Sequence, residues 1–587
     1  MYQRMNRFVF LTHTVAFMIT ATVFADPHAD LHKLLDDYWQ ARMMRSPERA
    51  TYLGDHRFDD QLTDYSEKAI DEDRVIYKRF ADLLKSIPRD KLSPDDHLNA
   101  DLFQHILDDA DLLDTFPEHF MPIKQQESFH ITLGLLQQYH KFDTVDDCAN
   151  YAKRLRLVSK QIDDMMAAMD KGIRLGIVRP KITVQQTLPQ IEAMIATDPR
   201  KSVLYPTTFN NPGPNVITDD KAHLNVEVSV IVANAALSKL RAYLQTTYLP
   251  KCRDTVGYGQ LPDGKAWYRA ASRVHTTTKL DPETIHQIGL DELKRIHADM
   301  LEIAREVGFD SDLRAFIEKM RTDPVQHNKT PAEIMRRHTE ILRRSDANLS
   351  KMFGVLPKIP YELKEMEPFR AEAAPEAYYY NAPDDGSRPA YFYVNTVRPE
   401  TRPIYTMEAL AYHEAQPGHH FQLAIAQEKK NWPMFRRFES INAYIEGWAL
   451  YSELLGYQLG GYNDPYSRFG QLTYDTWRSS RLVVDTGMHA MGWTRERAIQ
   501  FMKDNTALSE QNIVSEVDRY IAWPGQALGY KIGQLEILKI RREAETRLSR
   551  RFNIRAFHDE LLKEGSLPLS MLRDRMTKWI DAQLEEK

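Results

Sequence analysis

The most informative stretch of the chain is His413-Glu414-Ala415-Gln416-Pro417-Gly418-His419-His420. A His-Glu pair followed by a second His is typical of zinc peptidases, in which both His bind one metal and the Glu acts on water. The two His are four residues apart in the usual pattern, whereas His419 follows His413 by six. Six residues on an ideal helix rotate the side chain by about 240°. The backbone between these His must therefore be distorted if both are to reach one ion.

Pro417 and Gly418 offer a way to make that distortion. Proline removes one helical hydrogen bond, whose acceptor would be the carbonyl of His413, and glycine adopts dihedral angles that other residues avoid. We expect a bulge that turns His419 toward the metal. His420, seven residues after His413, is the alternative ligand. A plain helix end at Pro-Gly, with incidental His residues, also explains the pattern.

A second stretch offers a third ligand. Residues 445–453, Ile-Glu-Gly-Trp-Ala-Leu-Tyr-Ser-Glu, are predicted to be helical, and Glu446 lies among apolar residues. A carboxylate in such surroundings needs a partner, and a metal is one. Two His and this Glu give the open three-ligand arrangement of a catalytic zinc, with Glu414 as general base. Glu453 is interpreted either as a carboxylate behind the ligands or as a solvated one.

One region breaks the otherwise helical pattern. Residues 390–396 are aromatic and β-branched, and they follow Tyr378-Tyr379-Tyr380. Together these stretches predict a hairpin or small sheet shortly before the His-Glu motif. We expect the strand at 390–396, with Tyr393 and Asn395, to bind a substrate backbone as an added strand.

These motifs resemble the bacterial domain-of-unknown-function 885 family. The resemblance rests on the strings at 413–420 and 446–453, on 46–60 near the start and on 524–533 near the end, and it covers most of the chain. That family is regarded as zinc metallopeptidases of the Glu-ligand zincin kind. It is similar to the helical peptidases related to angiotensin-converting enzyme, thimet oligopeptidase and the carboxypeptidase Taq group.

The resemblance implies a mainly α-helical, two-lobed zincin-like fold with a deep cleft between the lobes. It also implies one Zn²⁺ per chain, bound by His413, His419 and Glu446, with Glu414 as base. In related helical zincins a Tyr from a late segment donates its phenol to the developing oxyanion. Tyr530 is our candidate for that role, and a core Tyr is the alternative interpretation.

Further polar residues are predicted to line the site. Residues 477–493 form a predicted helix with a polar stripe of Arg478, Arg481, Asp485 and His489. We expect Arg478 and Arg481 to bind substrate and His489 to contact it or assist catalysis. An Arg–Asp ladder that joins parts of the fold is the alternative.

Arg541 follows Tyr530 along a later helix and is a candidate clamp for a substrate carboxylate. A surface cation is the alternative interpretation of this residue. His28 and His32 have helical i, i+4 spacing, but Ala29 stands where a zincin would have Glu, so we expect no metal site there.

The composition is that of an ordinary globular protein. Of 587 residues, 43% are hydrophobic and 27% are charged, and the net charge of −6 argues against a nucleic-acid partner. Two cysteines are too few for a disulfide framework or a cysteine-built zinc site. Cys148 and Cys252 form one disulfide or remain two buried thiols.

Residues 1–25 have the three-part pattern of a secretory signal peptide: Arg4 and Arg7, an apolar run, and Val23-Phe24-Ala25 before the cleavage point. A membrane anchor is the alternative, and the lack of a Cys after the run argues against a lipoprotein anchor. We expect a periplasmic or secreted mature chain with no stable membrane insertion after cleavage.

The rest of the chain is predicted to be mostly amphipathic helix. Ser93, Asp281 and Thr330 each precede a Pro and mark helix starts. We place an N-terminal helical lobe at 26–275 and a C-terminal lobe with the metal site at 276–587, together one structural domain.

The sequence therefore predicts an exported zinc metallopeptidase that acts on short peptides. Two alternatives are another metal-dependent amide hydrolase with a non-peptide substrate and a non-catalytic binding protein on a zincin scaffold. Glu414 argues against the second, because a binding protein needs no base there.

Overall fold

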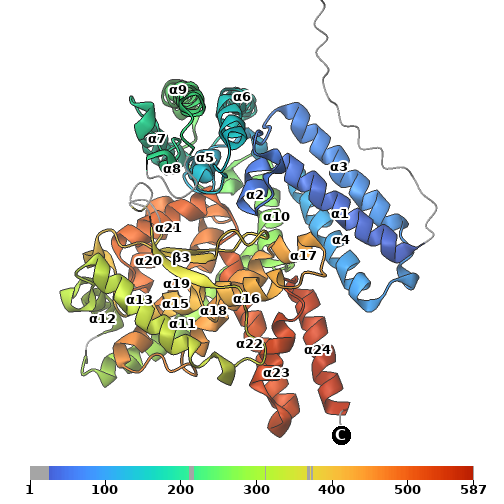
Figure 1. The fold of residues 1–587 in the computed structure, drawn as a ribbon. Coiled ribbons are helices and arrows are strands. Elements are labelled where there is room, and N and C mark those ends of the chain that lie inside the picture. Colours follow the sequence, from blue (N-terminus) through green and yellow to red (C-terminus); the bar gives the residue numbers. More distant parts are fainter. Residues whose placement is uncertain (1–25, 211–216, 311, 367–370, 372–374, 586–587) are drawn as a thin grey trace, which may run out of the picture.

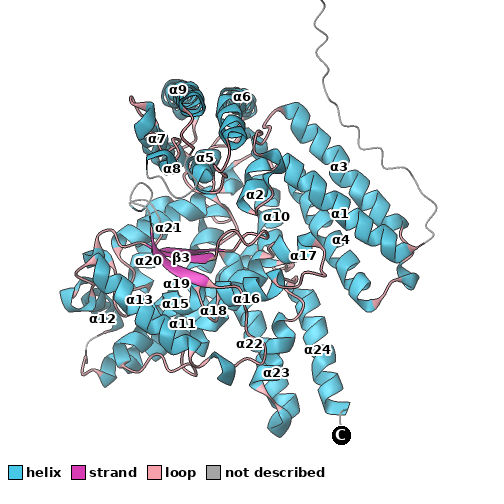
Figure 2. Ribbon diagram, in the orientation of Figure 1, coloured by secondary structure: helices cyan, strands magenta, loops and turns pink. Residues whose placement is uncertain are grey.

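The computed structural model describes residues 26–210, 217–310, 312–366, 371 and 375–585. This part of the chain is mainly helical with one small sheet, as predicted (Figures 1 and 2). The predicted signal peptide at 1–25 lies outside the described residues. No helix in the described ranges is long and apolar enough to cross a membrane.

The first helices of the described chain lie together at one side of the molecule (Figure 1). Their bounds are α1 (Pro27–Arg45), α2 (Pro47–Tyr52), α3 (Glu67–Ser86) and α4 (Pro94–Asp114). The predicted start of α4 is confirmed: the Ser93 side chain accepts a hydrogen bond from the backbone N–H of Asp96, and Pro94 occupies the first turn.

A second group of helices has a hydrophobic core of its own, in which α6 packs on α9. It contains α5 (Phe129–Leu135), α6 (Val145–Leu175), α7 (Lys181–Met194), α8 (Thr207–Asn210) and α9 (Asp220–Tyr243). Cys148 and Cys252 are both buried in this core as free thiols, so the second of the two alternatives for these residues is found.

The remaining helices build the body that carries the His-Glu motif. α19 is its central helix, since it is buried along most of its length and packs on α11. Asp281 and Thr330 cap α11 and α13, as predicted. The bounds are α10 (Gly264–Thr276), α11 (Pro282–Glu306), α12 (Leu313–Thr322), α13 (Pro331–Asp346), α15 (Met407–Glu414), α16 (His419–Gln427), α17 (Met434–Phe438), α18 (Asn442–Leu455), α19 (Pro465–His489), α20 (Arg495–Asn505), α21 (Glu510–Ala522), α22 (Leu528–Leu548), α23 (Ile554–Leu562) and α24 (Leu569–Glu585).

One large hydrophobic core joins the two ends of the chain. It contains Leu35 of α1, Trp448 of α18 and Leu572 of α24. Helices from before and after position 275 therefore share buried apolar surface, which ties the N-terminal helices to the body. The division at 275 and 276 stays a prediction.

The sheet has three strands in the order β1-β3-β2. The central strand β3 (Ala390–Val394) runs parallel to β1 (Tyr361–Glu365) and antiparallel to β2 (Ala377–Tyr380). Pairing of β2 with β3 confirms the predicted small sheet, and β1 was not predicted.

The position of β3 corrects one expectation. Because β3 lies between two strands, its backbone is already paired on both sides and cannot accept a substrate strand. Tyr393 is 6% exposed and Asn395 1% exposed, and Asn395 donates through Nδ2 to the carbonyl of Ala371. Both residues therefore belong to the packing of the sheet and not to a peptide-binding edge.

Candidate metal centre and its cavity

The His-Glu motif forms a turn between two helices and not a bulge within one. α15 ends at Glu414 and α16 begins at His419. The turn is fixed from α18, because Trp448 Nε1 and Ser452 Oγ both donate to the carbonyl of Pro417, at 2.8 and 3.3 Å. This corrects the predicted bulge: the helix stops completely, and a new helix carries the second His.

Gly418 occupies a place that has no room for a side chain. A Cβ atom there would lie 1.9 Å from the carbonyl oxygen of His413 and 2.4 Å from that of Tyr412. This close approach folds the chain back immediately after the turn. As a result the rings of His413 and His419 meet edge to face, with centroids 4.8 Å apart.

Three predicted ligands converge on one point. Nε2 of His413 lies 3.5 Å, and Nε2 of His419 lies 3.4 Å, from Oε2 of Glu446. One ligand atom from each residue lies within 4.8 Å of the other two. His420, the alternative ligand, points elsewhere: its Nδ1 lies 3.1 Å from the hydroxyl of Tyr379. The structure therefore brings His419, and not His420, to the other two residues.

The chemistry of this cluster fits a zinc ion. Oε2 of Glu446 is buried and has no hydrogen-bond partner among the described residues, although two imidazole nitrogens face it. A buried carboxylate oxygen of this kind needs a cation, and two His with one Glu are a known zinc-ligand set. Burial acts to raise the pKa of Glu446, but His419 and His413 outweigh it and hold that pKa well below its usual range.

Glu453 lies directly behind His413. Its Oε1 is 2.8 Å from Nδ1 of His413 and 3.5 Å from Nη2 of Arg478. Glu453 has no exposed surface, so it is not a solvated carboxylate. Burial acts to lower the pKa of His413, yet the neighbouring carboxylates of Glu446 and Glu453 outweigh it and leave that pKa raised. Arg478, predicted to bind substrate, thus also holds the partner of a candidate ligand.

The cluster opens onto a cavity of about 950 Å³. Glu414, the predicted base, is part of the cavity wall and is 9% exposed. Residues from both halves of the chain contribute to this wall. They include Leu102, His130 and Met194 from the N-terminal helices and His413, His419, Glu446, Arg478, Arg481 and Tyr530 from the body.

Tyr530 lies beside the candidate metal centre. Its ring is nearly parallel to that of His413, at 10°, with centroids 6.1 Å apart. Arg519 Nη2 lies 3.1 Å from its hydroxyl oxygen. Because Arg only donates, the phenol accepts this bond and keeps its own hydrogen for another acceptor. α22 comes close to α18 at two glycines, since a Cβ on Gly447 would lie 2.6 Å from Gly533.

Arg481 also lies in the cavity wall, where its guanidinium has a strong local partner. Nη2 of Arg481 is 2.8 Å from Oε2 of Glu516, and the guanidinium lies 4.2 Å from the centroid of the Tyr530 ring. Glu516 also lies 3.5 Å from Arg519, so two guanidinium groups share this carboxylate, and Arg481 packs against the Tyr530 ring. A substrate contact by Arg481 stays a prediction.

Two predicted site residues lie apart from the cavity. His489 is fully buried, accepts from the backbone N–H of Tyr258 at 3.1 Å and donates to the carbonyl of Tyr520 at 3.0 Å. Burial lowers the pKa of His489 to about 3. This corrects the expectation of a substrate or catalytic contact, because both ring nitrogens bind the protein itself.

Arg541 is the second predicted site residue that lies apart from the cavity. It pairs with Glu545 at 2.8 Å and donates to the Tyr451 hydroxyl at 3.0 Å, outside the cavity wall. The carboxylate clamp is therefore not formed by this residue.

Arg519 was missed by sequence analysis although it lines the cavity and binds Tyr530. Its eleven-residue separation from Tyr530 crosses a turn between two helices, so no helical spacing indicates the contact.

Fold and site together define a mainly helical protein with a two-His, one-Glu cluster in the wall of a cavity. The chain belongs to a family of bacterial proteins of unknown function, DUF885, whose family model matches residues 47–576. This confirms the family predicted from the motifs. No curated protein matches the chain.

Two solved structures are similar to this chain over 95% of its length. One is described as "the putative lipoprotein from Colwellia psychrerythraea", with 26% sequence identity, a TM-score of 0.89 and all of that chain covered. The other is "a putative lipoprotein of unknown function from Shewanella oneidensis", with 19% identity, a TM-score of 0.71 and all of that chain covered. The second likeness concerns the fold alone.

Proposed function

We propose that this protein is an exported zinc metallopeptidase that hydrolyses peptide bonds in short peptides. The observation that carries the proposal is the convergence of two imidazole nitrogens, from His413 and His419, on the unpartnered Oε2 of Glu446. The resemblance of the motifs to zincin-like peptidases supports the same class. Export rests on the signal-peptide pattern at 1–25.

Zinc bound by these three residues would supply Lewis-acid chemistry to a substrate carbonyl and to water. Glu414 directly follows His413 and lies in the cavity wall, where it can take a proton from the attacking water. The same carboxyl can then give that proton to the leaving amine. Glu453 holds the ring of His413 in one orientation throughout.

Tyr530 is suited to stabilise the oxyanion that forms during hydrolysis. Its hydroxyl accepts a hydrogen bond from Arg519, so its own hydrogen can point at the substrate. A cationic donor on the same oxygen makes the phenol a stronger hydrogen-bond donor through cooperative polarisation. Such a fixed donor acts where charge develops in the transition state.

The cavity suits an extended peptide. β2 is an edge strand, and residues 375–380, which contain it, line the cavity. A peptide can pair with this edge by adding a strand, so β2 replaces β3 in that role. The volume of about 950 Å³ is near the upper end of the range for small-ligand sites, which is enough for a few residues and too small for a folded domain.

The test is zinc analysis of the purified protein combined with a peptide-library digest followed by mass spectrometry. We expect about one zinc per chain at this site and cleavage of short peptides. Glu414→Gln should keep zinc and lose about 10²- to 10⁴-fold in activity. Zinc-loaded wild-type protein that cleaves no peptide in the library, or a Glu414→Gln variant with wild-type activity, would contradict the proposal.

A further inference from the structure

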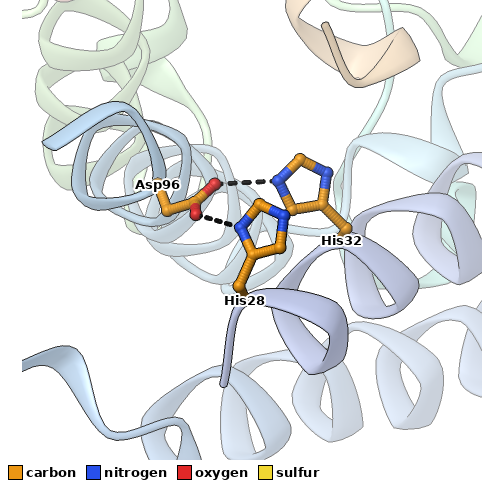
Figure 3. A group of neighbouring side chains, drawn as sticks. All are labelled: His28, His32 and Asp96. Carbon is orange, nitrogen blue, oxygen red and sulfur yellow. Dashed lines mark hydrogen bonds and ion pairs between the residues drawn. The ribbon is translucent and has the colours of Figure 1, made fainter. Parts of the chain in front are cut away.

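We propose that His28, His32 and Asp96 form a second metal site, which binds a divalent transition ion such as Zn²⁺ and fastens α1 to α4 (Figure 3). The group lies at the starts of these two helices. None of its members lines the cavity of the His-Glu motif. The site is thus separate from the proposed catalytic centre and does not depend on the proposed function.

The three side chains meet with one ligand atom each within 4.8 Å of the others. Asp96 uses both oxygens: Oδ2 lies 2.5 Å from Nδ1 of His28, and Oδ1 lies 2.8 Å from Nε2 of His32. Figure 3 shows both rings on the same side of the carboxylate. The two ring centroids are 4.4 Å apart.

Local sequence explains why these residues are brought together. His28 and His32 are one helical turn apart, so they share a face of α1. Asp26 fixes the start of that helix by accepting from the backbone N–H of His28. Asp96 lies in the first turn of α4, where Ser93 caps the helix. Two capped helix starts thus hold the two halves of the site.

The two His–Asp contacts would have to open to admit an ion. Ligands at about 2.0–2.1 Å from a tetrahedral zinc lie about 3.3 Å from one another, so the present His–Asp separations would open by roughly 0.5–0.8 Å. The His28 side chain is 62% exposed and the His32 side chain 37% exposed. Their outer face can therefore move and leaves a position for water, while imidazole and carboxylate ligands suit Zn²⁺, Co²⁺ and Ni²⁺.

Asp96 has the buried support that metal-binding carboxylates usually have. It is 2% exposed and accepts hydrogen bonds from Ser93 Oγ at 3.0 Å and from Asn99 Nδ2 at 3.3 Å. Asn99 in turn accepts from Arg436 Nη1 at 3.1 Å, and Arg436 pairs with Glu564 at 2.9 Å. The site therefore lies where α1 and α4 meet the body. An ion there would stabilise this junction, and Ala29 offers no base for catalysis.

The test uses the full-length mature protein, stripped with a chelator and titrated with Co²⁺ while its absorption spectrum is recorded. We expect two Co²⁺ per chain for the wild type. The double variant His28→Ala/His32→Ala should lose one ion, and His413→Ala should lose the other. His97→Ala, which changes a neighbour of Asp96 outside the cluster, is the matched control and should keep both.

A second readout is the thermal midpoint. Co²⁺ or Zn²⁺ should raise the Tm of His413→Ala, in which only the α1–α4 site remains, and should leave the Tm of His413→Ala combined with Asp96→Asn unchanged. Asp96→Asn keeps the size of the side chain and one acceptor oxygen, so it also serves if the double His variant fails to fold.

The proposal is overturned if the wild type binds one Co²⁺ and His413→Ala binds none. It is also overturned if the double His variant still binds two ions. Failure of the proposed peptidase function would give a different result, because the wild type would still bind the α1–α4 ion while cleaving no peptide.

Discussion

Oε1 of Glu453 lies 2.8 Å from Nδ1 of His413, and this contact decides which nitrogen of the ring faces Glu446. A carboxylate only accepts hydrogen bonds, so Nδ1 carries the ring hydrogen and Nε2 presents its lone pair. Carboxylates behind ligating His residues orient the ring and increase its basicity. Glu453 is therefore expected to set the affinity of the proposed zinc site without touching the ion.

Glu453→Gln should lower zinc affinity about 10- to 100-fold. The amide is neutral, so it holds the imidazole less strongly and leaves Arg478 facing no charge. Competition with a chromophoric chelator measures the change. Glu545→Gln, which removes a carboxylate paired with Arg541 outside the cavity, should leave zinc affinity unchanged. If Glu453→Gln and Glu545→Gln bind zinc with equal affinity, Glu453 does not support the metal centre.

His419→Ala should abolish zinc binding at this site, whereas His420→Ala should keep it. The reason is the helix break, which turns His419 to Glu446 and leaves His420 against the hydroxyl of Tyr379. Zinc content of both proteins after dialysis is the measurement, with circular dichroism as the control for folding. Metal loss in His420→Ala alone would require a continuous helix through Pro417.

Tyr530→Phe should lower kcat by about 10²-fold, a loss of about 2.7 kcal/mol in transition-state stabilisation. KM and zinc content should change little, because the hydrogen bond forms mainly in the transition state. Steady-state kinetics on a peptide found in the library digest measures the effect. The matched control is Tyr457→Phe, at a ring that is 43% exposed and outside the cavity wall. An unchanged kcat in Tyr530→Phe would assign this residue to packing alone.

Gly418→Ala should reduce both stability and zinc affinity. Its Cβ would fall 1.9 Å from the carbonyl oxygen of His413, so the turn has to open and separate the two His rings. We expect a loss of about 1–3 kcal/mol in the free energy of unfolding, measured with denaturant. Gly134→Ala is the control, because the nearest atoms to its new Cβ lie 3.6 Å away. Equal stability and zinc affinity in both variants would contradict this explanation of the turn.

Local signals made the helix starts predictable, along with residues of the candidate metal cluster. Capping by Ser93, Asp281 and Thr330 depends on residues three positions away, and a sequence displays such patterns directly. Residue chemistry indicated His413 and Glu446 as candidate ligands in two separate stretches, whereas the choice of His419 over His420 rested on the family resemblance.

Contacts between distant segments were not predictable in the same way. Periodicity placed His489 on one face of α19 with Arg478, but it could not show that this end of the face meets Tyr258 and Tyr520 instead of the cavity. The stretch at 390–396 was identified as a strand, yet its place at the centre of the sheet depends on β1.

The pair His28 and His32 was discounted because Ala29 replaces the Glu of a zincin motif, and the contact that makes it a candidate site lies far away in the sequence. Its partner, Asp96, is 64 residues beyond His32, and the sequence displayed that residue only as part of a helix start. Helical spacing identifies two ligands on one helix, but only the packing of α1 on α4 supplies the third.

α18 carries Glu446, the two donors Trp448 and Ser452 that fix the turn at Pro417, and Glu453 behind His413. Their separations are set by one helix, at about 100° and 1.5 Å per residue. A single inserted residue after Glu446 would rotate the other three by about 100° and uncouple them from the turn. The segments 413–420 and 446–453 are thus expected to change together among relatives. Chimaeras that take these two segments from different, divergent relatives should fail to fold more often than chimaeras with crossovers elsewhere.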